Sequence, residues 1–141
     1  MFTEIRDITA FNKQEILALR IADNQQNFIE STDQCLAEAE MDRRFTPLGL
    51  YKDSTVIGFA MYGVFPHDDQ SQRVWLDRYL IDERYQGQSL GKHFLQQLIH
   101  YLTEKFSCHK IYLSVYDNNV VAYINSLALY LMVNWMIKGK K

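Results

Sequence analysis

Two glycines and two basic residues lie close together near the middle of the chain, in the run Arg84-Tyr-Gln-Gly87-Gln-Ser89-Leu-Gly91-Lys92. The first turn of a helix carries unpaired backbone N–H groups and a partial positive charge, so it can hold an anion. Glycine lets the backbone approach that anion closely, and Arg84 and Lys92 add positive charge. The run therefore predicts a diphosphate-binding loop at the start of a helix.

The spacing separates this loop from two other phosphate-binding loops. A Walker A loop has four residues between its glycines and a Ser or Thr after its Lys, whereas here three residues separate Gly87 from Gly91 and His93 follows Lys92. A dinucleotide-binding fingerprint needs three glycines after the first strand, and the chain lacks them. The loop alone leaves one alternative open, a turn that joins a strand to a helix and binds nothing.

Periodicity predicts the elements that position the loop. A strand is expected over 74–81, and apolar residues at spacings of three and four predict a helix over 89–105, followed by a strand over 110–115. This order is typical of a parallel crossover. Alternation in the first strand separates two sets of side chains. One face should carry Trp75, Asp77, Tyr79 and Ile81, and the other Leu76, Arg78 and Leu80.

Upstream elements follow from caps and turns. Ser31 and Gln34 have the spacing of a capping box, which predicts a helix over 32–41. Turn residues at 52–54 separate two runs rich in β-branched and aromatic residues, which predicts a hairpin over 48–65. A short strand over 2–8 and a helix over 11–22 are expected before them.

The composition limits the class of protein. The 141 residues show no composition break, and 48% are hydrophobic, so a single domain over 1–141 with one core is expected. A net charge of −2 gives no basic face for nucleic acid. Cys35 and Cys108 are too few for a disulfide framework or a cysteine zinc site, which favours a cytoplasmic protein without a metal. No signal peptide or membrane-spanning stretch is evident, so no membrane partner is expected.

The loop and its flanking elements resemble the GNAT superfamily of N-acetyltransferases. Its signature, Arg/Gln-x-x-Gly-x-Gly/Ala, is matched by Arg84, Gly87 and Ser89, with Ser at the last position. The order of elements agrees over about 1–122, and the segments 28–31, 58–63 and 74–87 are most similar to bacterial diamine acetyltransferases acting on spermine and spermidine. The resemblance implies an α/β (α+β) GNAT fold, a mixed twisted sheet with helices on both faces. It also implies transfer of an acetyl group from acetyl-CoA to a polyamine amine.

The resemblance implies further roles for single residues. Backbone groups of the strand would pair with the pantetheine arm of acetyl-CoA, and the loop would hold its diphosphate. Asn119, in Asn119-Val-Val-Ala122, would contact the cofactor further along. The residues expected at the cofactor are Tyr79, Leu80, Ile81, Arg84, Gln86, Gly87, Gln88, Ser89, Leu90, Gly91, Lys92 and Asn119.

Acetylation of an amine requires a proton acceptor. A polyamine nitrogen has a pKa near ~10, so roughly one in a thousand is neutral and nucleophilic at pH 7. Asp77 is the first candidate for base or amine contact, because it lies on the strand beside the expected thioester. A charge that is solvated or paired with a neighbour is the alternative. Glu30 is a second candidate for amine binding, against a solvated residue before a helix cap. A strand N–H near Leu80 is the expected oxyanion donor.

The C-terminal segment departs from the family pattern from about residue 123. Ser126 stands where the family has its general-acid Tyr, and Tyr130 is the displaced candidate for that role. One allowed back-translation read in another frame gives a family-like ending, so a frameshift after Ala122 is a hypothesis that reading the gene would test. As it stands, the sequence predicts a missing or altered final strand and an apolar tail that packs as a helix on the core or in a homodimer. Acetylation of a protein N-terminus or a drug, or a weakened acetyl-CoA-binding protein, remain the alternative functions.

Overall fold

The computed structural model describes residues 2–20, 31–66, 72–108, 110–114 and 132–136. They form one sheet of six strands in the order β1-β2-β3-β4-β5-β6. Neighbours from β1 to β4 are antiparallel, whereas β4–β5 and β5–β6 are parallel, so the sheet is mixed as predicted. The strands are β1 (Thr3–Asp7), β2 (Phe45–Lys52), β3 (Thr55–Pro66), β4 (Gln72–Ile81), β5 (Lys110–Ser114) and β6 (Met132–Met136).

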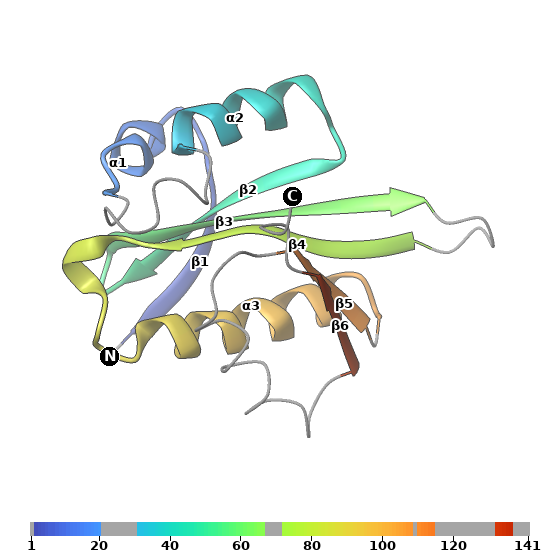
Figure 1. The fold of residues 1–141 in the computed structure, drawn as a ribbon. Helices are drawn as coiled ribbons and strands as arrows, with labels where there is room; N and C mark the ends of the chain where they lie inside the picture. The colour runs from blue at the N-terminus through green and yellow to red at the C-terminus, as the bar shows by residue number, and fades with distance from the viewer. Residues whose placement is uncertain (1, 21–30, 67–71, 109, 115–131, 137–141) are drawn as a thin grey trace.

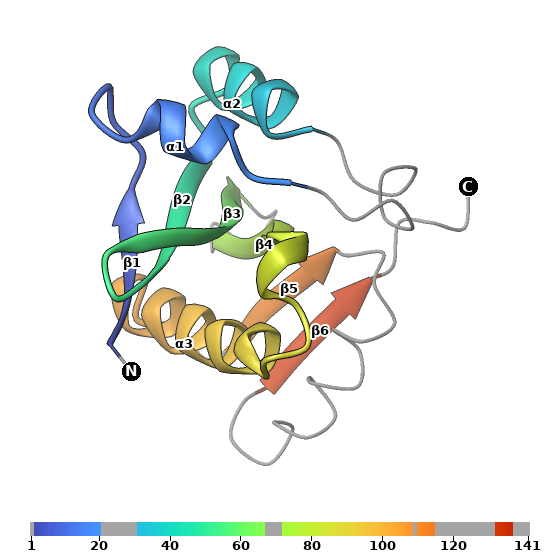
Figure 2. The ribbon, with the colours of Figure 1, turned by 90° about the vertical axis from the view of Figure 1, so that its left-hand side faces the viewer.

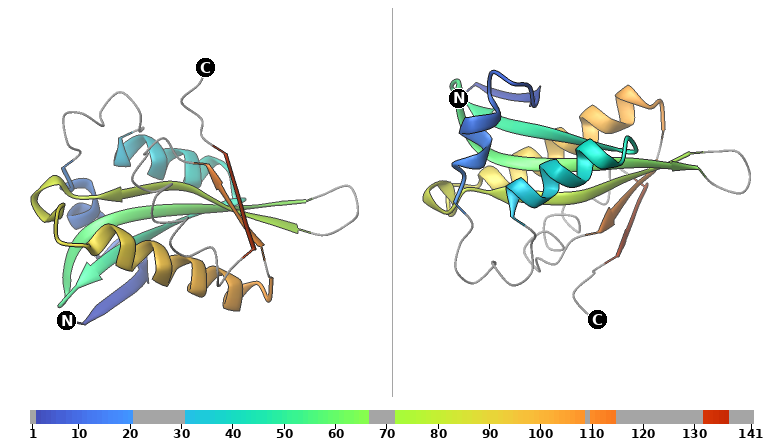
Figure 3. Two further views of the ribbon diagram at one scale, coloured as in Figure 1. Left: turned by 60° about the horizontal axis from the view of Figure 1, so that its bottom comes forward. Right: turned by 90° about the horizontal axis from the view of Figure 1, so that it is seen from above.

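Helices lie on both faces of the sheet, which confirms the predicted architecture. The helices α1 (Lys13–Leu17) and α2 (Thr32–Met41) cover one face, and α3 (Leu90–Lys105) covers the other (Figures 1 and 2). The antiparallel strands β3 and β4 run side by side and extend past the helices at one end (Figure 3). Within the described ranges, no helix combines the length and the apolarity needed to cross a bilayer.

The ends of the N-terminal helices follow from local hydrogen bonds. The capping box is present, because Ser31 Oγ accepts from the Gln34 backbone N–H while Gln34 Oε1 accepts from the Ser31 backbone N–H. The prediction of a helix over 32–41 is confirmed. Of the helix expected over 11–22, the described residues up to Arg20 are α-helical from Lys13 to Leu17, and residues 21 and 22 lie outside the described part of the chain. The helix begins later than expected because a turn precedes it. In this turn the Asn12 side-chain oxygen accepts a hydrogen bond from the Thr9 N–H, and the Asn12 side-chain nitrogen donates to the Asp7 carbonyl.

Two apolar clusters lie against the two faces of the sheet. The apolar stripe of α3, in which Phe94 and Leu98 are fully buried, packs against residues of β2, β3 and β4 such as Leu50. On the opposite face, Ile16 and Leu36 pack against Phe59 and Met61 of β3, together with Leu80 of β4. Burial of each large apolar side chain stabilises the fold by about 1.5–3 kcal/mol, so these clusters fix how the helices sit on the sheet.

A β-bulge in β4 overturns the predicted alternation of its side chains. Met61 pairs with Arg78 and the next β3 residue pairs with Leu76, so Asp77 is an extra residue without a partner position on β3. One extra residue reverses which side chains face up and down beyond it. Leu76 therefore packs on the α3 side and Leu80 on the α1–α2 side, whereas the sequence pattern placed both on one face.

The C-terminal segment also differs from expectation. We expected a missing or altered final strand and a tail that packs as a helix, but residues 132–136 form β6 and pair in parallel with β5 along its whole length. The outer edge of β5 offers a row of backbone N–H and C=O groups, and an added strand satisfies them. Residues 115–131 and 137–141 lie outside the described part of the chain.

Candidate functional site

The predicted loop connects β4 to α3 and begins with a single 3-10 turn over Glu83–Tyr85. Gly87 has φ 80°, a backbone conformation that residues with a side chain rarely adopt, and a Cβ there would meet no atom within 4 Å. The space around Gly87 is therefore open. Glycine is needed here for the direction of the backbone, and the open space leaves room for a ligand.

The first turn of α3 carries no side-chain cap. Ser89 is the N-cap residue, with left-handed backbone angles of φ 62° and ψ 13°, and its side chain makes no capping hydrogen bond. The N–H groups of the first helical turn have no intrahelical acceptor by geometry. Leu90, Gly91 and Lys92 thus present N–H groups at a positive helix end. This is the arrangement that binds phosphate oxygens.

The left-handed residue also suggests a second register for the sequence signature. Shifted by two residues, Gln86 takes the first position, Ser89 the place of the first glycine and Gly91 the last position. A glycine is expected where the backbone is left-handed, and Ser89 is left-handed. This register places the glycine substitution at the start of the helix.

Arg84 is directed at a buried carboxylate within the loop. Asp82 is fully buried, and its two oxygens accept from Arg84 Nε at 2.9 Å and Arg84 Nη2 at 2.8 Å. Burial raises the pKa of Asp82, but the hydrogen bonds from Arg84 and from backbone N–H groups lower it further, so the net pKa lies below its ordinary value. The guanidinium expected near the diphosphate is thus an ion-pair partner inside the loop.

The register between β4 and β3 determines which backbone groups of β4 point toward β3 and which point toward the opposite edge of the strand. The Asp82 N–H donates to the Ile57 carbonyl of β3 at 2.8 Å. Because successive residues of a strand direct their backbone groups to opposite edges, Leu80 also faces β3, while Tyr79 and Ile81 face the edge toward β5. Of the described residues of β5, only two pair with β4, at Trp75 and Leu76. Among the described residues, no strand pairs with this edge of β4 beyond Leu76, and an extended chain could follow it.

Two side chains connect this strand edge to the loop and the helix. The Tyr79 hydroxyl donates to the backbone carbonyl of Gly91 in the first turn of α3. Gln86 Nε2 donates to the Ile81 carbonyl at 2.9 Å, from the loop back to the end of the strand. The strand edge and the helix start are therefore held in a fixed relation.

Asp77 lies in the bulge of β4 and is paired with a cation. The Arg78 guanidinium contacts the Asp77 carboxylate through Nη1 and the Glu38 carboxylate of α2 through Nη2 at 3.3 Å. Arg78 is buried and the Asp77 side chain is 11% exposed. Two carboxylates thus flank one guanidinium on the α2 side of the sheet, which leaves an excess of negative charge beside the bulge.

Some predicted residues fall outside this arrangement. Glu30, Asn119 and Tyr130 lie outside the described residues. Sequence reasoning missed Asp82 and Glu38. The signal for Asp82 was available, because an Asp at the end of a strand and two residues before an Arg is typical of a capped turn. In the part of the chain that the structure describes, no group of three or more His, Cys, Asp or Glu residues is placed to hold a metal ion.

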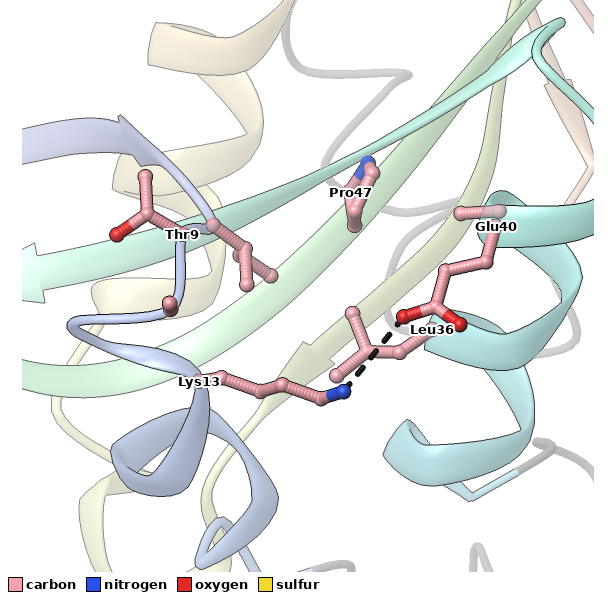
Figure 4. Close-up of a pocket in the computed structure, with 8 residues that line it drawn as sticks. Thr9, Lys13, Leu36, Glu40 and Pro47 are labelled. Atoms are coloured by element: carbon pink, nitrogen blue, oxygen red, sulfur yellow. Dashed lines mark ion pairs between the residues drawn. The ribbon is translucent and has the colours of Figure 1, made fainter.

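A separate hollow of about 350 Å³ lies between the β1–α1 connection, α2 and β2 (Figure 4). Its floor is mainly apolar, and Lys13 Nζ lies 3.6 Å from Glu40 Oε1 at its rim. None of its lining residues belongs to β4 or to the loop. The lining residues are Ile8, Thr9, Ala10, Lys13, Leu36, Ala39, Glu40 and Pro47.

Comparisons with known proteins identify a family and several relatives. Residues 12–130 match the Acetyltransferase (GNAT) family. The chain is 43% identical over 143 aligned positions to the spermine/spermidine N(1)-acetyltransferase of Bacillus subtilis (strain 168), covering 99% of this chain and 91% of that protein. Among solved structures, a ribosomal-protein-alanine N-acetyltransferase from Brucella melitensis biovar Abortus 2308 is similar with a TM-score of 0.64 and 16% identity, over 94% of this chain and 92% of that one. A Trypanosoma brucei acetyltransferase has a TM-score of 0.65 and 16% identity, over 96% and 97%.

Proposed function

The chain belongs to the GNAT acetyltransferase family and is an N-acetyltransferase, and we propose that it acetylates a primary amine of a polyamine such as spermidine or spermine. The observation that carries the proposal is 43% identity to a spermine/spermidine N(1)-acetyltransferase over nearly the whole chain. Two solved acetyltransferases at 16% identity support the fold alone. The acetyl donor in this family is acetyl-CoA, and the local structure of the loop and strand fits that cosubstrate.

Two structural features of this chain fit acetyl-CoA. The uncapped start of α3, from Gly87 to Lys92, suits the diphosphate. The edge of β4 at Tyr79 and Ile81 suits the amide groups of pantetheine, which can pair with it as an extra strand would. Leu80 lies between these two residues with its backbone toward β3, so the backbone contact with pantetheine expected of Leu80 is not supported. We assign Asn119 to a cofactor contact from the sequence resemblance.

Negative charge beside the β4 bulge suits a cationic substrate. Asp77 and Glu38 share one guanidinium, so the group carries a net charge of about −1 that attracts an ammonium. We assign amine contact to Asp77 and Glu30, and a general-base role to Asp77, directly or through water. Glu38 of α2 contributes negative charge to the same proposed substrate-binding region.

In the proposed reaction, the amine displaces the thiol of acetyl-CoA. The neutral amine nitrogen attacks the thioester carbonyl carbon, so a C–N bond forms and the C–S bond breaks. The proton lost by the amine passes to Asp77 or to water, and the leaving thiolate takes a proton from Tyr130 in our assignment. Acetyl-CoA supplies the thioester. The chain itself positions the two reactants and moves the protons.

The direct test measures release of coenzyme A thiol with a panel of amines. Spermidine and spermine should be turned over with a higher kcat/KM than a peptide N-terminus or an aminoglycoside. If another amine is turned over with a higher kcat/KM than the polyamines, the proposal of a polyamine substrate is wrong. Binding of acetyl-CoA with no turnover of any amine would indicate a cofactor-binding protein with weakened catalysis.

We also infer that residues 1–141 act as one domain in the cytoplasm, as a homodimer. Cys35 and Cys108 are not joined by a disulfide, which suits a reducing compartment. Phe11 and Met41 are almost fully exposed apolar side chains, and a second chain would cover them in the proposed dimer. Light scattering during gel filtration should give twice the chain mass of 16.7 kDa, and a mass equal to one chain would contradict the dimer.

A further inference from the structure

Asp82 is the only fully buried carboxylate among the described residues. Besides the Arg84 guanidinium, it accepts hydrogen bonds from the Arg84 backbone N–H at 2.8 Å and from the Arg20 backbone N–H at 2.9 Å. Two carboxylate oxygens offer about four acceptor positions, and four donors are present. Groups of this chain therefore fill the hydrogen-bonding capacity of Asp82. This favours a structural role for Asp82 over direct contact with a ligand.

The hydrogen bonds of Asp82 join two segments that are distant in sequence. Arg20 follows α1, which packs on the face of the sheet opposite α3. The connection is reciprocal, because the Glu83 N–H donates to the Arg20 carbonyl at 3.0 Å while the Arg20 N–H donates to Asp82. The 3-10 turn that opens the loop is thus fastened to the chain beyond α1 by two hydrogen bonds.

We propose that Asp82 is a positioning residue for diphosphate recognition, and that Arg84 acts through Asp82 rather than as a phosphate ligand. The pair fixes the turn over Glu83–Tyr85, and this turn sets where the backbone N–H groups from Gly87 to Lys92 point. The inference rests on the proposed use of acetyl-CoA. It does not depend on which amine is acetylated.

One substitution, Asp82→Asn, should change coenzyme A affinity in opposite directions depending on whether Asp82 acts through its charge or by positioning the loop. Asp82→Asn removes a negative charge beside the proposed diphosphate site, so charge alone would tighten binding of the anion. If Asp82 positions the loop, the same substitution weakens binding, because the amide turns an N–H toward the donors of Arg84 and Arg20. A misplacement of about 1 Å can cost roughly a hundredfold in the rate of a catalysed reaction, and we expect a loss of diphosphate binding of up to that order.

Asp42 provides a matched control in the same chain. Asp42 also accepts hydrogen bonds from the backbone N–H, Nε and Nη2 of an Arg two residues later, Arg44. The difference is that the Asp42 side chain is 29% exposed and lies after α2, whereas Asp82 is 0% exposed and lies in the loop. Asp42→Asn therefore removes the same local ion pair without touching the proposed diphosphate site.

The test compares ligands with and without the diphosphate, using the full chain. Calorimetry should give a Kd of coenzyme A that rises about tenfold to a hundredfold in Asp82→Asn, and by less than about twofold in Asp42→Asn. The kcat/KM with acetyl-CoA should fall by a similar factor, whereas the value with S-acetylpantetheine, which lacks the diphosphate, should change less than about threefold. Unchanged or tighter coenzyme A binding, or equal losses with both acetyl donors, would overturn the inference.

A second variant keeps the inference testable if Asp82→Asn does not fold. Arg84→Lys retains the positive charge but loses the bidentate hydrogen bonding of the guanidinium to Asp82. It should weaken coenzyme A binding nearly as much as Arg84→Gln does, whereas a direct phosphate ligand would be largely rescued by Lys. If the wild-type chain acetylates no polyamine yet binds coenzyme A, the proposed substrate fails while these binding measurements still decide the role of Asp82.

Discussion

The hydroxyl of Tyr79 in β4 donates a hydrogen bond to the backbone carbonyl of Gly91 in α3. One end of this contact is the strand that we propose pairs with pantetheine, and the other is the helix turn that we propose holds the diphosphate. A single cosubstrate would span both elements, so their separation must suit its length. The contact between these two residues helps to hold that separation, together with the apolar packing of α3 on the sheet.

Removal of this contact should impair cosubstrate binding more than folding. In Tyr79→Phe the ring stays packed beside the α3 cluster, but the hydroxyl is lost. We expect the KM for acetyl-CoA to rise about fivefold to tenfold, because a hydrogen bond contributes roughly 1 kcal/mol. Steady-state kinetics with acetyl-CoA varied would measure this. An unchanged KM with a lower melting temperature would assign Tyr79 to stability alone.

The left-handed Ser89 predicts a stabilising substitution. A residue with a side chain costs about 1 kcal/mol in this conformation, and glycine does not. Ser89→Gly should therefore raise the free energy of unfolding by up to about 1 kcal/mol, or the melting temperature by about 3 °C. Ser89→Ala is the matched control, since it keeps the strain. Thermal unfolding of both variants would decide, and equal melting temperatures would argue against strain at Ser89.

Gly58 allows the close approach of β3 to β4 beside the proposed cofactor edge. A Cβ at this position would lie 2.6 Å from the Leu80 carbonyl oxygen, which belongs to the backbone and cannot rotate away. Gly58→Ala should lower the free energy of unfolding by about 1–3 kcal/mol, as overpacking does. Urea denaturation measures the change. A loss below a few tenths of a kcal/mol would show that the strands separate without cost.

Asp82 predicts a dependence of stability on pH. Its pKa in the folded protein is lowered below the unfolded value of about 3.9. Such a group stabilises the fold above the unfolded pKa, and the contribution is lost as the pH falls through the folded pKa. The difference in free energy of unfolding between wild type and Asp82→Asn should thus be largest near neutral pH and shrink below about pH 4. A difference that stays constant from pH 7 to pH 3 would contradict a charged Asp82.

Much of the fold could be predicted because its signals are local. The capping box of Ser31 and the apolar stripe of α3 each act within a few residues, and both predicted elements were confirmed. The extra residue at Asp77 could not be read from the sequence, because it depends on how β4 registers with β3. The apolar pattern of residues 132–136 suits either a buried helix or a strand, and pairing with β5 decides between them.

The parts of the site that depend on backbone geometry could be predicted from the sequence, whereas the pairing of charged side chains could be predicted less well. Gly87 and the start of α3 were placed correctly on a strand-to-helix loop. Arg84 was expected to add positive charge for a phosphate, but a buried Asp82 takes its hydrogen bonds. The spacing of Asp82 and Arg84 is a signal of a capped turn, but it does not show that Asp82 is buried, since Asp and Arg are usually exposed.

Acetyl transfer from acetyl-CoA to a polyamine is measured most directly by mass spectrometry of spermidine incubated with the purified 141-residue chain and acetyl-CoA, alongside thiol release. We expect a mass increase of one acetyl group on spermidine, with one equivalent of free thiol for each amine acetylated. Thiol release without acetylated spermidine, or no reaction while coenzyme A binds, would contradict it.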